Sequence, residues 1–283
     1  MRWTPGGRSD DLEDRRDEGG GGGFGGMHIG IGGFLILLVL SFVFKKDFFS
    51  LIGGQGVATG PAVSQPDPQR DAREEPMVQF VSFVLDDTQK TWAGILQQKG
   101  IPYQHAKLVL FRDVTSSGCG AAQSATGPFY CPEDQKVYID LGFYDELQRR
   151  FGAPGQFAQA YVLSHELGHH VQNLLGIERK VRSLEGSNPG SQNALSVRLE
   201  LQADCFAGVW AKSTQQRNLL EAGDVESALG AAAAVGDDRL QRMSRGQVSP
   251  DSFTHGTSAQ RTEWFQRGMN GGTVESCNTF QLH

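Results

Sequence analysis

The chain has 283 residues, enough for one large domain or two small ones, with an ordinary hydrophobic content of 39%. Its formal net charge is −6, so nothing in the composition indicates a surface that binds nucleic acid. The apolar residues are spread unevenly along the chain, and this unevenness defines the predicted organisation.

Residues 1–26 are predicted to form a disordered, glycine-rich tail. The stretch mixes four arginines with six acidic residues and ends in a run in which seven of eight positions are glycine. Such a segment has high backbone entropy and almost nothing apolar to bury, so folding cannot offset the entropy lost. We therefore expect no packed structure before residue 27.

Residues 27–44 contain no acidic residue, lysine or arginine and are predicted to form one transmembrane helix. Eighteen helical residues reach about 27 Å, just enough to cross the hydrocarbon core of a bilayer. A cleaved signal peptide is the alternative, but the acidic tail before the run and Lys45-Lys46 after it favour an uncleaved, single-pass anchor. Residues 45–76, rich in proline and glycine, are predicted to be a linker that precedes a domain at residues 77–283.

The predicted domain has few strand patterns and several long helical ones, which indicates an α+β fold that is mainly helical with a small β-sheet. Short runs of β-branched and aliphatic residues predict strands at 107–111 and 136–141. Helical spacing of apolar residues predicts helices at 78–98, 145–151, 156–175, 192–213, 225–235 and 258–269.

The sequence His-Glu-Leu-Gly-His at residues 165–169 lies within one of these helices. Residues four apart share a helix face, so the imidazoles of His165 and His169 can point at one ion. Glu166 can reach a water held by that ion, an arrangement typical of zinc peptidases. The alternative is a solvated helix that carries two histidines by chance. Apolar flanking residues favour a buried helix, which should not hold these polar groups unless something satisfies them.

A catalytic zinc ion needs a third protein ligand, and the next helical pattern offers Glu200. Asp204 lies one turn further along the same face, where it would accept the Nδ1–H of a zinc-bound histidine and fix its tautomer. The alternative is an exposed acidic face on an amphipathic helix. The pattern predicts one catalytic Zn²⁺ held by His165, His169 and Glu200.

The four cysteines all lie in the C-terminal part of the chain, which suits an oxidising environment. The preferred pairing is Cys119–Cys131, which would close a glycine-rich loop, with Cys205–Cys277, although four cysteines allow three connectivities. Zinc binding by cysteine is the competing account, but the chain has no Cys-x-x-Cys. With the predicted anchor, the cysteines place the domain outside the cytoplasm, on the periplasmic or extracellular side.

His255 precedes a predicted helix whose start Thr257 or Ser258 would cap. Peptide hydrolysis passes through an oxyanion, and a positioned side-chain donor can stabilise it. His255 is therefore a candidate for that donor, or a structural residue bonded to the capping loop. Arg261, on the same helix, is a weaker candidate for holding carboxylates. His170 points roughly 100° around the helix from His169, so it is expected to be structural.

The His-Glu-x-x-His motif followed by Glu-x-x-Ala-Asp resembles the gluzincin class of zinc peptidases. More closely, the chain from about Val78 to its end resembles the bacterial neutral zinc metallopeptidases, the YpfJ-like family. The glycine-rich stretch and the apolar segment before it fit that family too. The resemblance implies a zincin-like metallopeptidase domain, but no substrate. The stretches that carry it are 119–120, 127–132, 137–140, 165–172, 255–261 and 264–265.

These features together predict a membrane-anchored zinc peptidase that acts on protein or peptide substrates. Glu166 would take a proton from the water that zinc activates and pass it to the leaving amine. The strand at 136–141 would either hold extended substrate as an edge strand or be an ordinary buried strand. The alternative function is a catalytically silent zinc-binding module that holds partner proteins at the membrane.

Overall fold

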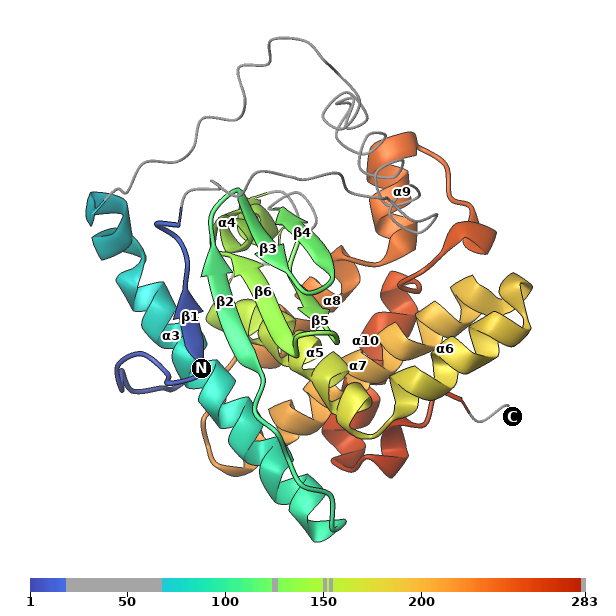
Figure 1. Ribbon diagram of the computed structural model, residues 1–283, viewed down its shortest axis with the longest axis horizontal. Helices are drawn as coiled ribbons and strands as arrows, with labels where there is room; N and C mark the ends of the chain where they lie inside the picture. Colours follow the sequence, from blue (N-terminus) through green and yellow to red (C-terminus); the bar gives the residue numbers. More distant parts are fainter. Residues whose placement is uncertain (19–67, 124–126, 150–151, 153–154, 281–283) are drawn as a thin grey trace.

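The computed structural model describes the whole chain except residues 19–67, 124–126, 150–151, 153–154 and 281–283. The architecture is α+β and mainly helical with a small sheet, as predicted (Figure 1). The strands are β1 (Leu12–Asp14), β2 (Lys107–Phe111), β3 (Val114–Ser117), β4 (Gly120–Gln123), β5 (Phe129–Cys131) and β6 (Lys136–Asp140). The α-helices are α3 (Pro68–Gln98), α4 (Gly142–Arg149), α5 (Gln156–Leu174), α6 (Ile177–Ser187), α7 (Gln192–Gln216), α8 (Asp224–Ala234), α9 (Asp237–Arg245) and α10 (Ser258–Gly271).

The four-stranded sheet has the order β1-β2-β6-β5. Strands β1, β2 and β6 are parallel, whereas β5 runs antiparallel to β6. Because β6 lies between β2 and β5, it is a central strand, and the prediction that residues 136–141 form an edge strand for substrate is wrong. The alternative, an ordinary buried strand, is correct: Val137, Tyr138 and Ile139 are all at most 1% exposed.

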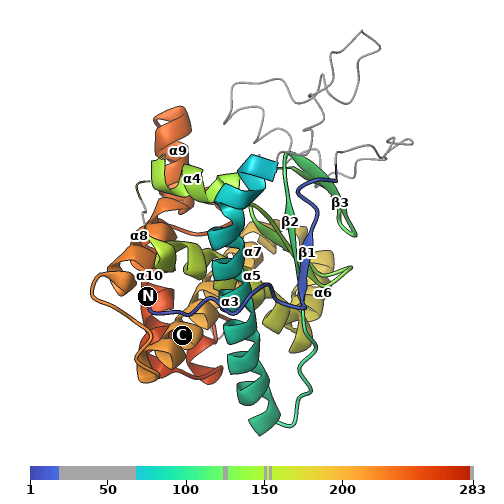
Figure 2. The same cartoon turned by 90° about the vertical axis from the view of Figure 1, so that its left-hand side faces the viewer.

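Helices α3 and α5 cover one face of the sheet, and α7, α8 and α10 lie behind them (Figures 1 and 2). Leu108 and Leu110 of β2 join Val137 and Ile139 of β6 in the main core with these helices. The other face of the sheet packs against the β3–β4 hairpin and forms a smaller core with it. This smaller core includes Tyr138 of β6 and the disulfide-bonded Cys131 of β5. The sheet is thus buried on both faces, and α5 is held centrally between sheet and helices.

The prediction that residues 1–26 form a disordered tail is wrong for residues 1–18, which are folded. Leu12 to Asp14 form strand β1, paired in parallel with β2. Arg16 is only 4% exposed and donates hydrogen bonds to Asp14 and to Glu74 of α3. Composition alone was misleading, because the segment adds itself to an existing sheet and its arginines pair with carboxylates of α3 as well as with those of the segment itself.

The predicted linker also ends earlier than residue 76, because α3 begins at Pro68. Residues 68–76 lack apolar periodicity, but Arg112 of the loop after β2 pairs with Asp71 and Glu74 and so fixes this first part of the helix. The predicted transmembrane segment at 27–44 lies outside the described residues. Within the part of the chain that is described, no helix is long and apolar enough to cross a membrane.

Both predicted disulfides are present. Cys119 is bonded to Cys131 and ties the β3–β4 hairpin to the edge strand β5. Cys205 is bonded to Cys277 and joins α7 to the segment that follows α10. The connectivity that the sequence left open is therefore settled in favour of the preferred pairing.

Helices α7 and α10 cross at unusually close range, because each carries a glycine at the crossing. A Cβ atom on Gly268 would lie 1.9 Å from the carbonyl oxygen of Cys205, and one on Gly208 would lie 2.0 Å from that of Phe265. No side chain fits at such distances, so both positions require glycine. This close approach brings Arg261 of α10 against the buried side of α7.

Candidate metal centre

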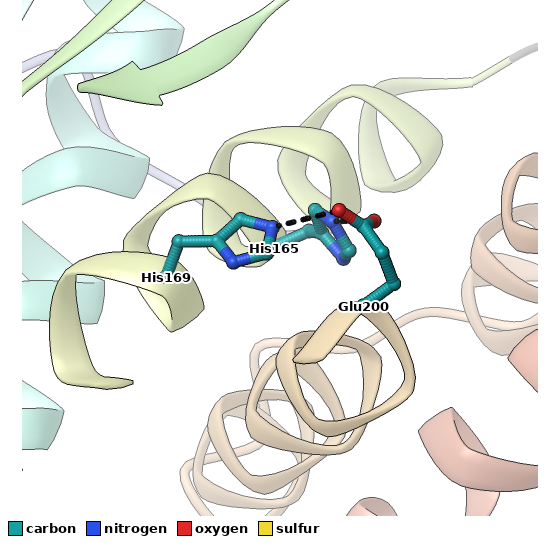
Figure 3. Close-up of side chains that lie close together, drawn as sticks. All are labelled: His165, His169 and Glu200. Carbon is teal, nitrogen blue, oxygen red and sulfur yellow. Dashed lines mark ion pairs between the residues drawn. The ribbon is translucent and has the colours of Figure 1, made fainter. Parts of the chain in front are cut away.

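The histidine motif on α5 faces the acidic residues of α7. At the contact, Gly168 packs against Ala203, and a Cβ on Gly168 would lie only 3.0 Å from the Ala203 carbonyl oxygen. Small residues thus let the two backbones approach until side chains of both helices meet. Figure 3 shows His165 and His169 projecting from one helix and Glu200 from the other, all directed toward a common point.

His165, His169 and Glu200 each present one ligand atom within 4.8 Å of the others, as the sequence predicted for a metal site. The Nε2 atom of His165 lies 3.2 Å from Glu200 Oε2, and that of His169 lies 3.5 Å from Glu200 Oε1 (Figure 3). Ligands about 2.05 Å from a tetrahedral zinc ion are about 3.3 Å apart, so these separations suit that ion.

The hydrogen bonds behind the imidazoles leave both Nε2 atoms free to bind metal. His165 Nδ1 lies 2.9 Å from Asp204 Oδ1, the contact predicted for Asp204. His169 Nδ1 lies 2.8 Å from Gln172 Oε1, a partner that the sequence analysis did not identify. Both acceptors lack a hydrogen on that oxygen, so each Nδ1 carries a proton and each Nε2 is the nitrogen that a metal ion would bind.

The carboxylates of α7 are held ionised. Burial opposes ionisation of Glu200, but His169 and His255 outweigh it and keep the pKa of this carboxyl well below its usual range. Burial likewise opposes ionisation of Asp204, and Arg261 together with His165 lowers the pKa of that carboxyl. Glu200 therefore offers a charged oxygen ligand, and Asp204 a charged acceptor.

Glu166 interacts electrostatically with all three predicted ligands but is not one of them. Its side chain is buried, and burial raises the pKa of this carboxyl above its usual value, against the opposing effect of His165 and His169. A carboxylate whose pKa is raised toward neutrality is a better proton acceptor and donor in catalysis. The placement and environment of Glu166 thus suit the general base that the motif predicts.

His255 reaches the same region from the loop before α10. Burial opposes protonation of this imidazole, but the charges of Glu200 and Asp237 outweigh it and raise its pKa above the usual value, so His255 interacts electrostatically with a predicted metal ligand. Asp237, at the start of α9, holds the loop: its Oδ2 accepts the backbone N–H groups of Thr254, His255 and Gly256. Its Oδ1 lies 3.2 Å from His255 Nδ1. Thr257 caps α10, as predicted.

Comparison with known proteins places the chain in a family. Residues 1–280 match the family described as "Putative neutral zinc metallopeptidase". The chain is 50% identical over 287 residues to "Uncharacterized protein YpfJ" of Escherichia coli (strain K12), covering 99% of both chains. It is 44% identical over 191 residues, 63% of each chain, to an uncharacterized protein of Mycobacterium tuberculosis (strain ATCC 25618 / H37Rv). No solved structure gives a significant match.

The chain belongs to this zinc metallopeptidase family. The family's description names zinc, and two imidazoles with one carboxylate are a donor set that zinc prefers. Membership of the family agrees with the resemblance drawn from the sequence. It leaves the substrate open, because both relatives are themselves uncharacterized.

Arg261 supports the metal centre by binding Asp204. The sequence analysis named it only as a weaker candidate for holding carboxylates and did not predict this partner. Its guanidinium donates from Nε to Asp204 Oδ2 at 2.8 Å and from Nη2 to Asp204 Oδ1 at 3.0 Å. It also lies 3.8 Å from Glu200 Oε2. Tyr161 donates its hydroxyl hydrogen to Asp204 Oδ1 as well. One buried carboxylate is thus shared by an imidazole, a guanidinium and a phenol.

His170 is outside the metal group, as expected. Its Nε2 lies 2.7 Å from the carbonyl oxygen of Gln104, which can only accept, so this nitrogen carries the proton. Its Nδ1 therefore accepts from the hydroxyl of Tyr130, 3.0 Å away. Burial lowers the pKa of this imidazole below its usual value, so it stays neutral. His170 joins α5 to strand β5 and to the loop before β2.

Proposed function

We propose that this protein is a zinc-dependent peptidase that hydrolyses peptide bonds of protein or peptide substrates. The observation that carries the proposal is the convergence of His165 Nε2, His169 Nε2 and a Glu200 carboxylate oxygen, with Glu166 beside them. A structural zinc site is closed by four protein ligands, whereas a catalytic site has three and keeps one position open. Three ligands with an adjacent carboxylate match the second kind.

In this proposal each residue around the site has its own role in hydrolysis. Zinc bound there would supply a Lewis acid that acidifies water and polarises the scissile carbonyl. Glu166 accepts the proton of the attacking water and later delivers it to the leaving amine. His255, held by Asp237, donates a hydrogen bond to the oxyanion that develops on the carbonyl. Asp204 and Gln172 keep the two imidazoles in the tautomer that binds metal.

The compartment in which the protein works belongs to this proposal. We place the metallopeptidase domain outside the cytoplasm, because both pairs of cysteines are joined in disulfides. Structural disulfides persist in oxidising environments and are rare in the cytosol.

The proposal is tested with purified full-length protein, casein and a zinc chelator. We expect about one zinc ion per chain by metal analysis, release of peptides from casein, loss of release with 1,10-phenanthroline, and recovery when zinc is restored. The rival function is a zinc-binding module without activity. Zinc at full occupancy with no peptide released from casein or from a mixed peptide library would support that module and contradict the proposal.

Replacing His255 tests its role as the oxyanion donor. The His255→Gln variant should keep zinc content and fold but lower kcat for a fluorogenic peptide by about 100-fold, since the removal of one oxyanion donor typically has this effect. The matched control is His105→Gln, because His105 is an exposed histidine that pairs with Asp11 and lies outside the metal group. Equal kcat values for His255→Gln and wild type would show that His255 only supports the capping loop.

A further inference from the structure

A chain of hydrogen bonds leads from His169 to the C-terminal segment. Gln172 Oε1 accepts from His169 Nδ1 at 2.8 Å, and Gln172 Nε2 donates to Gln202 Oε1 at 3.1 Å. Gln202 Nε2 in turn donates to the backbone carbonyl of Cys277 at 2.9 Å. Two glutamines on different helices thus connect a metal ligand to a residue 108 positions further along the chain, since 277 − 169 = 108.

The direction of every bond in this chain is set by backbone carbonyls, which can only accept. The Cys277 carbonyl requires the amide nitrogen of Gln202, so Gln202 Oε1 has to face Gln172. The carbonyl of Leu199 accepts from Gln172 Nε2 at 2.7 Å in the same way. Gln172 Oε1 therefore has to face His169, whose Nδ1 must carry the hydrogen. The tautomer of a metal ligand is fixed from the backbone.

Water cannot take over these contacts. The side chains of Gln172 and Gln202 are only 1% and 4% exposed. A buried amide that loses its partner keeps the full cost of its desolvation, so each bond in the chain is costly to break. This chain of hydrogen bonds from His169 through Gln172 and Gln202 to the Cys277 carbonyl, called the relay below, is therefore part of the protein interior and not a set of surface contacts.

The Cys277 end of the relay is anchored independently of the metal. Cys277 is fully buried and bonded to Cys205, the residue directly after Asp204 on α7. It packs with Trp92, Val171 and Phe206 in a cluster separate from the main core. Beyond it, the hydroxyl of Thr279 donates to the carbonyl of Arg198, 2.8 Å away. The segment is therefore fixed on α7 on both sides of the carbonyl that Gln202 uses.

We propose that Gln172 and Gln202 are positioning residues for the metal centre, and that the C-terminal segment at residues 274–280, held by the Cys205–Cys277 disulfide, sets zinc affinity through them. The inference rests on the proposed zinc site but not on peptidase activity. In this proposal the disulfide has a second role besides stabilising the fold. It fixes the position of the Cys277 carbonyl, which orients Gln202 and Gln172 and so determines the tautomer of His169. The other histidine ligand, His165, does not depend on these glutamines, because its Nδ1 bonds to Asp204.

Zinc alone is the probe for this relay, measured by competition with a fluorescent chelator on the full-length chain. We expect Gln172→Met to lower zinc affinity by about 10- to 100-fold and Gln202→Met by about 10-fold, as for other outer partners of metal-bound histidine. The double variant Cys205→Ala/Cys277→Ala should change affinity in the same direction as Gln202→Met. Its matched control is Cys119→Ala/Cys131→Ala, which removes the disulfide at the hairpin and should leave zinc affinity unchanged.

Two further measurements separate positioning from loss of fold. Thermal unfolding of the zinc-free variants reports their stability, and the nitrogen-15 shifts of His169 report its tautomer. A variant that is folded, has lost the Nδ1–H tautomer and binds zinc weakly supports the relay. Folded Gln172→Met and Gln202→Met proteins that bind zinc as tightly as wild type would overturn it. Wild-type protein that binds no zinc would instead overturn the proposed function, and this inference with it.

Discussion

Glu166→Gln is expected to abolish peptide hydrolysis while zinc remains bound. The amide has the shape of the carboxylate but cannot accept a proton from water or return one to the leaving amine. A positioned acid–base group contributes about 10²- to 10⁴-fold to rate, so kcat for a fluorogenic peptide should fall by about 10³-fold. Glu166 is not among the three ligands, and the zinc content of the variant should equal that of wild type.

The same substitution at an exposed position provides the control for this result. Glu263 is a solvent-exposed glutamate of α10 outside the metal group, and Glu263→Gln should have wild-type kcat and zinc content. If Glu166→Gln hydrolysed peptides as fast as that control, Glu166 would not be the base. If it lost both zinc and activity, the residue would act as a ligand, contrary to the geometry described above.

Arg261→Met is expected to cause the largest loss of stability among the substitutions considered. Arg261 and Asp204 are 4% and 0% exposed at their side chains, and the guanidinium makes two hydrogen bonds to the carboxylate. Removing one partner of a buried ion pair leaves an uncompensated charge and typically costs about 3–5 kcal/mol. The free energy of unfolding, measured by urea denaturation of zinc-free protein, should fall by about this amount.

An exposed arginine on the surface of α6 gives the comparison. Arg182 is 53% exposed and pairs with Glu178 one turn away. Exposed pairs of this kind contribute about 0.3–0.5 kcal/mol, so Arg182→Met should be almost neutral. A loss of stability in Arg261→Met no greater than in Arg182→Met would mean that Asp204 does not depend on Arg261. In that case Tyr161 and His165 alone would compensate its charge.

The metal ligands were predictable because their signal is local. His165 and His169 are four apart on one helix, and a buried helix with three polar groups on it calls for a partner. Glu200 and Asp204 were found by the same spacing on the next apolar helix. The helices at 156–174 and 192–216 followed from their apolar periodicity, and they begin where predicted.

Apart from Asp204, most residues that support the ligands were not predicted, because most of their contacts join distant parts of the chain. Gln202 and Asp237 have no spacing that marks them as partners of Gln172 or His255. The contact between His169 and Gln172 is local, because the two residues are three apart on α5, and the sequence analysis missed it. Arg261 reaches Asp204 only because glycines let α7 and α10 cross at close range. The sequence offered only one signal for these residues, an amide or acidic side chain near a motif residue. That signal identifies a partner only when the position of the neighbouring helix is known.

Strand β1 has a consequence for membrane topology. It is hydrogen-bonded to β2, so residues 12–14 and 107–111 must lie on the same side of any bilayer. One crossing between residues 18 and 68 would separate them, and the apolar run at 27–44 has length for one helical passage only. The pairing of β1 with β2 is therefore a constraint that any account of the run at 27–44 has to meet.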